Sequence, residues 1–195
     1  MSKGRLVFYV LVLSFVFSHV IFAEGKMNEK KKEFREGQKQ KREDFKEKAH
    51  DENKAFMESL KGMTPEQKTE ALKKHHEEMF NKHREQFEAM HQKRMEFLKN
   101  RLSKNSKLTD AQKEDLVKFY DNQYQENLAY GTQQHQENTE YFEKIANDSS
   151  LTMEQKKQAL REHQKEQMQE RKEHMKSQKQ ERKEYKKDLK SQKPE

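Results

Sequence analysis

The chain has no cysteine and no tryptophan, and only two prolines and five glycines among its 195 residues. Without cysteine it can form neither a disulfide framework nor a thiolate metal site. The scarcity of proline and glycine removes the residues that most often end helices and build tight turns. Leu, Ile, Val and Phe make up 20 of the 172 residues after position 23. Such a composition excludes a compact globule with a large apolar core.

Charged side chains take the place of apolar ones and make up 39% of the chain. Once Lys3 and Arg5 are set aside, 40 basic residues nearly cancel 35 acidic ones. Disorder usually requires a high net charge, and Lys, Glu, Gln, Arg and Met are good helix formers. The composition therefore predicts solvated helices with a thin core.

One phrase occurs three times, at intervals of 45 and 43 residues, and organises the chain. In each copy Gln follows Thr by three residues, Lys comes next, and two apolar residues stand seven and eight positions after the Thr. Thr and Gln at this spacing can form a capping box, so each copy predicts the start of a helix. The residues of this helix-capping motif are Met63, Thr64, Gln67, Leu108, Thr109, Gln112, Leu151, Thr152 and Gln155.

The phrases divide the chain into four long helices, expected over about residues 27–61, 65–102, 110–146 and 153–190. Gly62 is placed to end the first helix, and Gly131 indicates either a bend or a close approach in the third. Beyond Ser177 apolar residues become rare, so we expect a projecting helix or a frayed C-terminal end. Short turns imply antiparallel hairpins.

The predicted fold class is therefore all-α, an elongated molecule of four long helices. Its apolar stripes are narrow. In the first helix the stripe consists mainly of Phe34, Phe45 and Phe56, which lie 11 residues apart. A second chain can supply burial that one chain lacks, so we expect a homodimer.

Residues 1–23 have the pattern of a secretory signal. Lys3 and Arg5 form a basic start, residues 6–22 are almost wholly apolar, and Ala23 offers a cleavage site. The alternative is an uncleaved membrane anchor, because 17 apolar residues are at the short end of what spans a bilayer. We expect export through the Sec pathway to the periplasm, cleavage near Ala23, and a helical domain of residues 24–195.

A Leu-Thr-x-x-Gln phrase that opens helices in an exported, cysteine-free chain resembles the Spy/CpxP family of bacterial periplasmic proteins. The phrase is complete at Leu108 and Leu151, and Met63 replaces the leucine in the first copy. The family pattern has two copies, so the third copy and the extra length are departures from it. The resemblance implies an ATP-independent chaperone that forms a thin, curved helical dimer and holds partly unfolded proteins loosely. Zinc-responsive and nickel- or cobalt-sensing proteins belong to the same superfamily, and one member restrains a sensor kinase.

We therefore expect a periplasmic chaperone, not an enzyme, that holds unfolded or partly folded proteins and suppresses their aggregation. Flexible methionines suit promiscuous surfaces, and Lys and Arg attract acidic clients while their stems cover apolar surface. The sequence contains no glycine-rich phosphate loop for a nucleotide-driven cycle. The residues expected to contact clients are Phe34, Phe45, Phe56, Met79, Phe80, Phe87, Met90, Tyr120 and Tyr124.

Histidine and methionine crowd the second helix, which indicates an alternative function. Imidazole and thioether groups four residues apart share a helix face and suit zinc, copper or nickel. The alternative is thus a periplasmic metal-binding or envelope-stress-sensing protein. The same residues also fit a semi-polar packing stripe, in which case no cofactor is expected. The candidate ligands are His75, His76, Met79, His83 and His91.

Other classes of function have weaker support. The basic run from Lys165 to Lys193 is interrupted throughout by Glu and Gln, so we interpret it as a solvated helix. We expect no nucleic-acid partner, and contact with a membrane surface is disfavoured. No pattern for a nucleophile or a paired acid and base is present, so no catalytic residue is assigned. A structural helical rod without a client is the third hypothesis.

Overall fold

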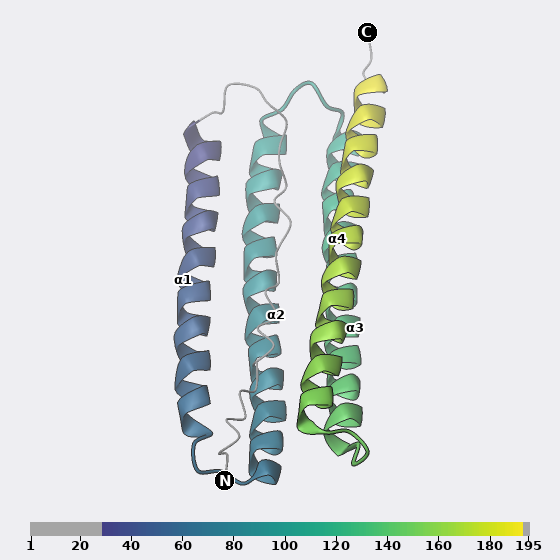
Figure 1. The fold of residues 1–195 in the computed structure, drawn as a ribbon. Helices are drawn as coiled ribbons and strands as arrows, with labels where there is room; N and C mark the ends of the chain where they lie inside the picture. Colours follow the sequence, from purple (N-terminus) through teal and green to yellow (C-terminus); the bar gives the residue numbers. More distant parts are fainter. Residues whose placement is uncertain (1–28, 193–195) are drawn as a thin grey trace. The chain divides into compact units, whose positions relative to one another are not determined.

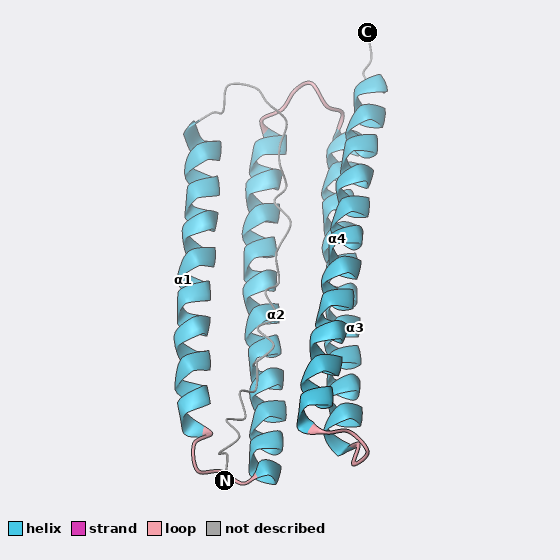
Figure 2. Ribbon diagram, in the orientation of Figure 1, coloured by secondary structure: helices cyan, strands magenta, loops and turns pink. Residues whose placement is uncertain are grey.

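The computed structural model describes residues 29–192, which form four helices and no strand (Figures 1 and 2). The helices are α1 (Glu29–Ser59), α2 (Pro65–Ser103), α3 (Asp110–Asn147) and α4 (Met153–Ser191). Every predicted boundary within the described range agrees to within two residues, and the all-α prediction is confirmed. The predicted signal at residues 1–23 and the predicted helix start at residue 27 lie outside the described residues. Within residues 29–192 no helix is long and apolar enough to cross a membrane.

Local chemistry explains where the helices stop and continue. Gly62 follows α1 with a φ of 85°, in the left-handed region that glycine adopts without strain. The N–H of Met63 donates to the carbonyl of Leu60 across the same turn, at 3.3 Å. α3 continues without interruption through Gly131, which is buried, so this glycine fits a close approach rather than a bend.

The chain divides into two compact units, one ending at His83 and the other beginning at Arg84. The first unit contains α1 and the first half of α2. Phe45 contacts His83 and Phe56 contacts His75, so position advances along α1 as it falls along α2. This order makes the α1–α2 pair an antiparallel hairpin.

The second unit contains the rest of α2 together with α3 and α4. Tyr141 stacks on His163 near one end of the α3–α4 pair, and Phe119 stacks on Tyr185 near the other. The two helices are therefore antiparallel, and they lie side by side in Figure 1.

The apolar core of the second unit centres on Leu98 and Leu102 of α2 and Leu116 of α3. Tyr185 and Leu189 of α4 pack against this cluster, and α4 remains helical to Ser191. The prediction of a projecting or frayed end beyond Ser177 is therefore wrong. Two apolar side chains four residues apart are enough to dock this end, because they meet an apolar cluster on two other helices.

The interior is only half apolar. Among the described residues, 11 apolar and 10 polar or charged side chains are buried. The most deeply buried large side chain is an amide, that of Gln178, which is 1% exposed. Buried polar groups destabilise a fold unless they are hydrogen-bonded, so their partners decide how the helices are joined.

Candidate functional site

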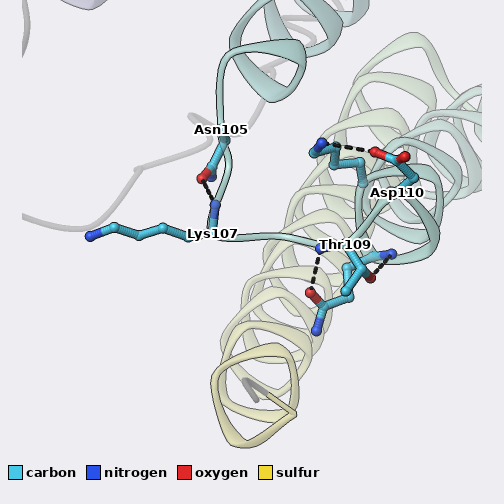
Figure 3. A network of polar contacts seen from close by, with 6 residues as sticks. Asn105, Lys107, Thr109 and Asp110 are labelled. Atoms are coloured by element: carbon cyan, nitrogen blue, oxygen red, sulfur yellow. Dashed lines mark hydrogen bonds and ion pairs between the residues drawn. The ribbon is translucent and has the colours of Figure 1, made fainter. Parts of the chain in front are cut away.

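The repeated phrase forms three capping boxes. In each, the Thr hydroxyl accepts from the backbone N–H of the Gln, and the Gln side-chain oxygen accepts from the backbone N–H of the Thr. Figure 3 shows the second copy, where the two distances are 3.2 and 3.0 Å. The predicted capping role of the phrase is confirmed at Thr64 and Gln67, Thr109 and Gln112, and Thr152 and Gln155.

Neighbouring side chains fix the second copy further (Figure 3). Asn105 accepts from the backbone N–H of Lys107 at 3.0 Å, which orders the turn before the cap. Asp110 at the start of α3 pairs with Lys113 at 2.9 Å, and this contact lowers the pKa of the Asp110 carboxyl. All these contacts are local and stabilise a helix start. They leave no open position at which a ligand would be recognised.

A cap of this kind predicts a modest loss of stability on mutation. Thr109→Ala should lower the free energy of unfolding by about 1 kcal/mol, because an N-terminal N–H loses its acceptor. Urea denaturation followed by circular dichroism measures this loss. Thr132→Ala is the matched control, since Thr132 is exposed within α3 and bonds only the carbonyl of Leu128. The assignment would be contradicted if Thr109→Ala left stability unchanged but weakened client binding.

Between α3 and α4 runs a directional chain of hydrogen bonds. Asn138 donates to Gln167 at 3.3 Å, and Gln167 donates to the carboxylate of Glu137 at 3.1 Å. The Asn138 oxygen is therefore left to accept from Nε2 of His163, 2.9 Å away. A carboxylate only accepts, so the chain runs from imidazole to carboxylate and fixes a neutral His163 with its proton on Nε2.

The same chain occurs again 11 residues away on both helices. His174 donates to Asn127 at 3.1 Å, Asn127 to Gln178 at 2.6 Å, and Gln178 to Glu126 at 3.2 Å. We call each of these two sets of contacts a polar module. A further contact pair completes each module: Gln134 with Glu170 and Arg171, and Gln123 with Glu181 and Arg182.

One more step of 11 residues turns the pattern apolar. Leu116 stands where the modules have Asn127 and Asn138, and Leu189 stands where they have Gln178 and Gln167. Phe119 and Tyr185 keep the ring stack, with centroids 4.0 Å apart. This apolar layer belongs to the core cluster, so one repeating geometry accommodates both polar and apolar interiors.

Histidine stacking recurs across all three helix pairings. In four places a histidine lies flat on an aromatic ring and its Nε2 contacts an Asn or Asp three residues before that ring. Ring centroids are 3.8 to 4.1 Å apart and interplanar angles are 8 to 15°. The four sets are His75 with Phe56 and Asn53, His91 with Tyr124 and Asp121, His163 with Tyr141 and Asn138, and His174 with Tyr130 and Asn127.

Burial tunes the titration of these interiors. It lowers the pKa of His75, His163 and His174, although nearby carboxylates such as Glu166 beside His163 oppose the shift. Burial also raises the pKa of Tyr120 to about 12, against the opposing charge of Arg182. Both effects favour neutral forms near neutral pH.

The candidate metal ligands of α2 have other contacts. His75 is bound to Asn53, His91 to Asp121, and His83 meets Phe45 edge-on at 4.9 Å. His76 is half-buried and Met79 is buried. Residues 29–192 contain no group of three His, Cys, Asp or Glu side chains placed to hold a metal ion. Metal binding stays a prediction from the sequence alone.

The predicted client contacts fall into two groups. Met79, Phe80, Phe87, Met90 and Tyr124 are buried, so in this conformation they pack the interior. Phe34, Phe45, Phe56 and Tyr120 are half-buried, and for these four the assignment stays a prediction. The large apolar side chains that the described part of the chain exposes most are Met153 and Met168, which the sequence analysis had not assigned to clients.

An open groove of about 340 Å³ lies between α3 and α4 beside the Tyr141–His163 stack. Carboxylates of Glu137, Glu140, Glu166 and Glu170 line it. Three of them accept from glutamine amides, of Gln167, Gln136 and Gln134. The groove is therefore the solvent edge of a polar module, and its chemistry belongs to the packing of the two helices.

Sequence reasoning missed the polar modules. The signal that could have found them is the 11-residue spacing of identical residues in α4: His163 and His174, Gln167 and Gln178, Arg171 and Arg182. The same spacing was noted among the phenylalanines of α1, where apolar residues made it visible.

Comparison with known proteins adds no relative. No protein-family model matches the chain, and no curated protein and no solved structure matches it. The resemblance to the Spy/CpxP family therefore rests on the three capping phrases and the composition of the chain.

Proposed function

We propose that this chain is an ATP-independent chaperone that holds unfolded or partly folded proteins and suppresses their aggregation. The observation that carries the proposal is the make-up of α1. The buried side chains of this helix are Gln38, Ala49 and Asn53, and none is a large apolar group. Its phenylalanines are instead half-buried, so aromatic surface stays accessible along the helix.

The row of Phe34, Phe45 and Phe56 has a spacing suited to an extended client. Eleven residues complete three helical turns at about 3.67 residues each, which keeps the three rings on one side of α1. The rings are then roughly 16 Å apart at 1.5 Å per residue. An extended client segment covers that distance in about five residues. A client with apolar side chains at this interval could contact two or three rings at once.

Charged side chains surround the row and suit loose binding. Lys41, Lys46 and Lys48 are exposed on α1, and the whole chain has a net charge of +7. Long lysine stems cover apolar surface, and their charges attract acidic segments over distances set by the ionic strength. Raising the salt concentration should therefore slow client capture more than it weakens the final complex.

The proposal places the protein in the periplasm, after export directed by residues 1–23. It also includes a homodimer, because half of the buried side chains are polar and one chain buries little apolar surface. Sedimentation equilibrium of the chain from residue 24 tests this point. A species with the mass of a single chain across micromolar concentrations would exclude the dimer.

The client surface is tested by the triple variant F34S/F45S/F56S in aggregation assays with several unrelated clients and no nucleotide. Loss of the ring contacts should weaken client affinity at least about tenfold, or 1.4 kcal/mol. The double variant M153S/M168S is the matched control, because it removes exposed apolar side chains from α4 instead. Circular dichroism verifies that both variants remain helical.

Two results would contradict the proposal. One is a wild-type chain that fails, at equimolar dimer, to slow the aggregation of any client. The other is a folded triple variant that protects clients as well as the wild-type chain does, which would exclude the row on α1 as the client surface.

A further inference from the structure

Two histidines of α2 hold α1 in place. The His75 ring lies flat on Phe56, with centroids 3.8 Å apart and an interplanar angle of 8°. Its Nε2 is 2.6 Å from the side-chain oxygen of Asn53. Two turns further along α2, the His83 ring meets Phe45 edge-on at 4.9 Å. We call these two contact sets the α1 latch.

Little apolar burial supports the α1 latch. Within α1 the only buried apolar side chain is Ala49, because the other buried positions are Gln38 and Asn53. Burying one methyl group contributes roughly 1 kcal/mol, far less than a leucine or phenylalanine would. By contrast, α3 and α4 are joined by two polar modules and an apolar layer. Among these pairings, α1 therefore depends most on its histidine contacts.

The turn after α1 can act as a hinge. Gly62 is exposed and has a φ of 85°, and no atom lies within 4 Å of the place where a side chain would start. The hydrogen bonds of this turn are two short local contacts, from Lys61 to Glu58 and from Met63 to Leu60. A change in the direction of α1 would therefore break few bonds outside the α1 latch.

The charges that face the α1 latch come from both helices. Glu52 of α1 and Glu78 of α2 raise the pKa of His75, whereas Lys82 lowers it, and burial is the largest effect and lowers it overall. Lys82 also pairs with Glu52 across the two helices at 2.8 Å. For His83, burial alone lowers the pKa. Both imidazoles thus prefer the neutral form while α1 is docked.

Acid should consequently favour release of α1. Above about pH 6.5 both histidines are neutral in either state, and docking keeps its full stability. As the pH falls below that value, a released imidazole gains its proton more readily than a docked one. Docking therefore weakens until the pH reaches the lower pKa of the docked state.

We propose that acidification releases α1 from the first half of α2 about Gly62 and exposes Phe45, Phe56 and Met79 to clients. Met79 is buried and stands between His75 and His83 at four-residue intervals, on the helix face that meets α1. The consequence for clients rests on the proposed function. The movement itself does not, so the two can be tested separately.

Spin labels on two cysteines measure the movement directly. The chain has no cysteine of its own, so the labels are unique. In K54C/K74C they stand on exposed positions next to the Asn53–His75 contact. Between about pH 7.5 and 5.5 the population with long inter-label distances should rise at least about fivefold, the low end of typical couplings. In E140C/E166C, on two residues that line one groove between α3 and α4, the distances should stay unchanged.

Histidine variants identify the groups responsible. H75Q/H83Q keeps an amide donor near Asn53 but cannot titrate, so its distances should not change with pH. H163Q/H174Q is the matched control in the α3–α4 pair and should release α1 as the wild-type chain does. The proposal is overturned if the wild-type distances do not change with pH, or if H75Q/H83Q responds as strongly as the wild-type chain.

A short bis-maleimide link between Cys residues of K54C/K74C separates movement from client binding. At pH 5.5 the linked chain should protect clients at least about fivefold less well than the unlinked chain. If the labels report release but the link leaves protection unchanged, the movement stands and the proposed client surface on α1 is wrong. If the labels report no release, the inference fails whatever the clients do.

Discussion

Replacing Gln178 by leucine alone should lower the free energy of unfolding by about 2–3 kcal/mol. Gln178 is 1% exposed, accepts from Asn127, and donates to Glu126 and to the Gln123 carbonyl. Leucine fills a similar volume but satisfies none of these groups. The Asn127 amide and oxygen then lose part of a network that excludes water. Urea denaturation of the Q178L chain measures the effect.

The full apolar exchange should behave differently. N127L/H174Y/Q178L gives this polar module the side chains of the apolar layer, where Leu116, Tyr185 and Leu189 occupy the equivalent positions. Removing all three polar partners together leaves no broken chain, so stability should return to within about 1 kcal/mol of the wild type. A triple variant as unstable as Q178L would show that the two layers are not equivalent.

Leu102→Ala should lower the free energy of unfolding by about 3 kcal/mol. Leu102 is buried at 7% exposure in the cluster where α2, α3 and α4 meet, so the cavity it leaves cannot fill with water or easily collapse. The measurement is again urea denaturation, with the second unit followed by a probe such as the fluorescence of Tyr185.

Leu160→Ala is the control for this cavity, because Leu160 of α4 is only half-buried. The same chemical change there should lower stability by no more than about 1.5 kcal/mol. Equal losses at the two positions would contradict the assignment of the core to the end of α4 that was expected to be frayed.

The helices could be predicted from the sequence because their boundaries depend on local chemistry. Thr109 and Gln112 form their capping box within four residues, so nothing distant is needed to place the start of α3. Gly62 likewise ends its turn through its own φ. These signals are complete within the sequence that contains them.

The interior could not be predicted in the same way. A search for apolar periodicity assigns Gln167, Gln178 and Arg182 to the solvent, yet all three are buried. Their burial depends on partners 29 to 59 residues away, and no pattern within α4 specifies those partners. For the same reason the stripe residues Phe87 and Tyr124 were expected to face clients, although they contact each other.

The 11-residue spacing has a consequence for the length of the α3–α4 hairpin. Sliding α4 by one step would bring Gln167 to Asn127 and rebuild one polar module, but it would also bring Gln178 against Leu116. The apolar layer therefore allows a single alignment. Adding or deleting one 11-residue segment in both helices preserves that alignment. The hairpin is thus built in interchangeable units, with the apolar end as the fixed point from which they are counted.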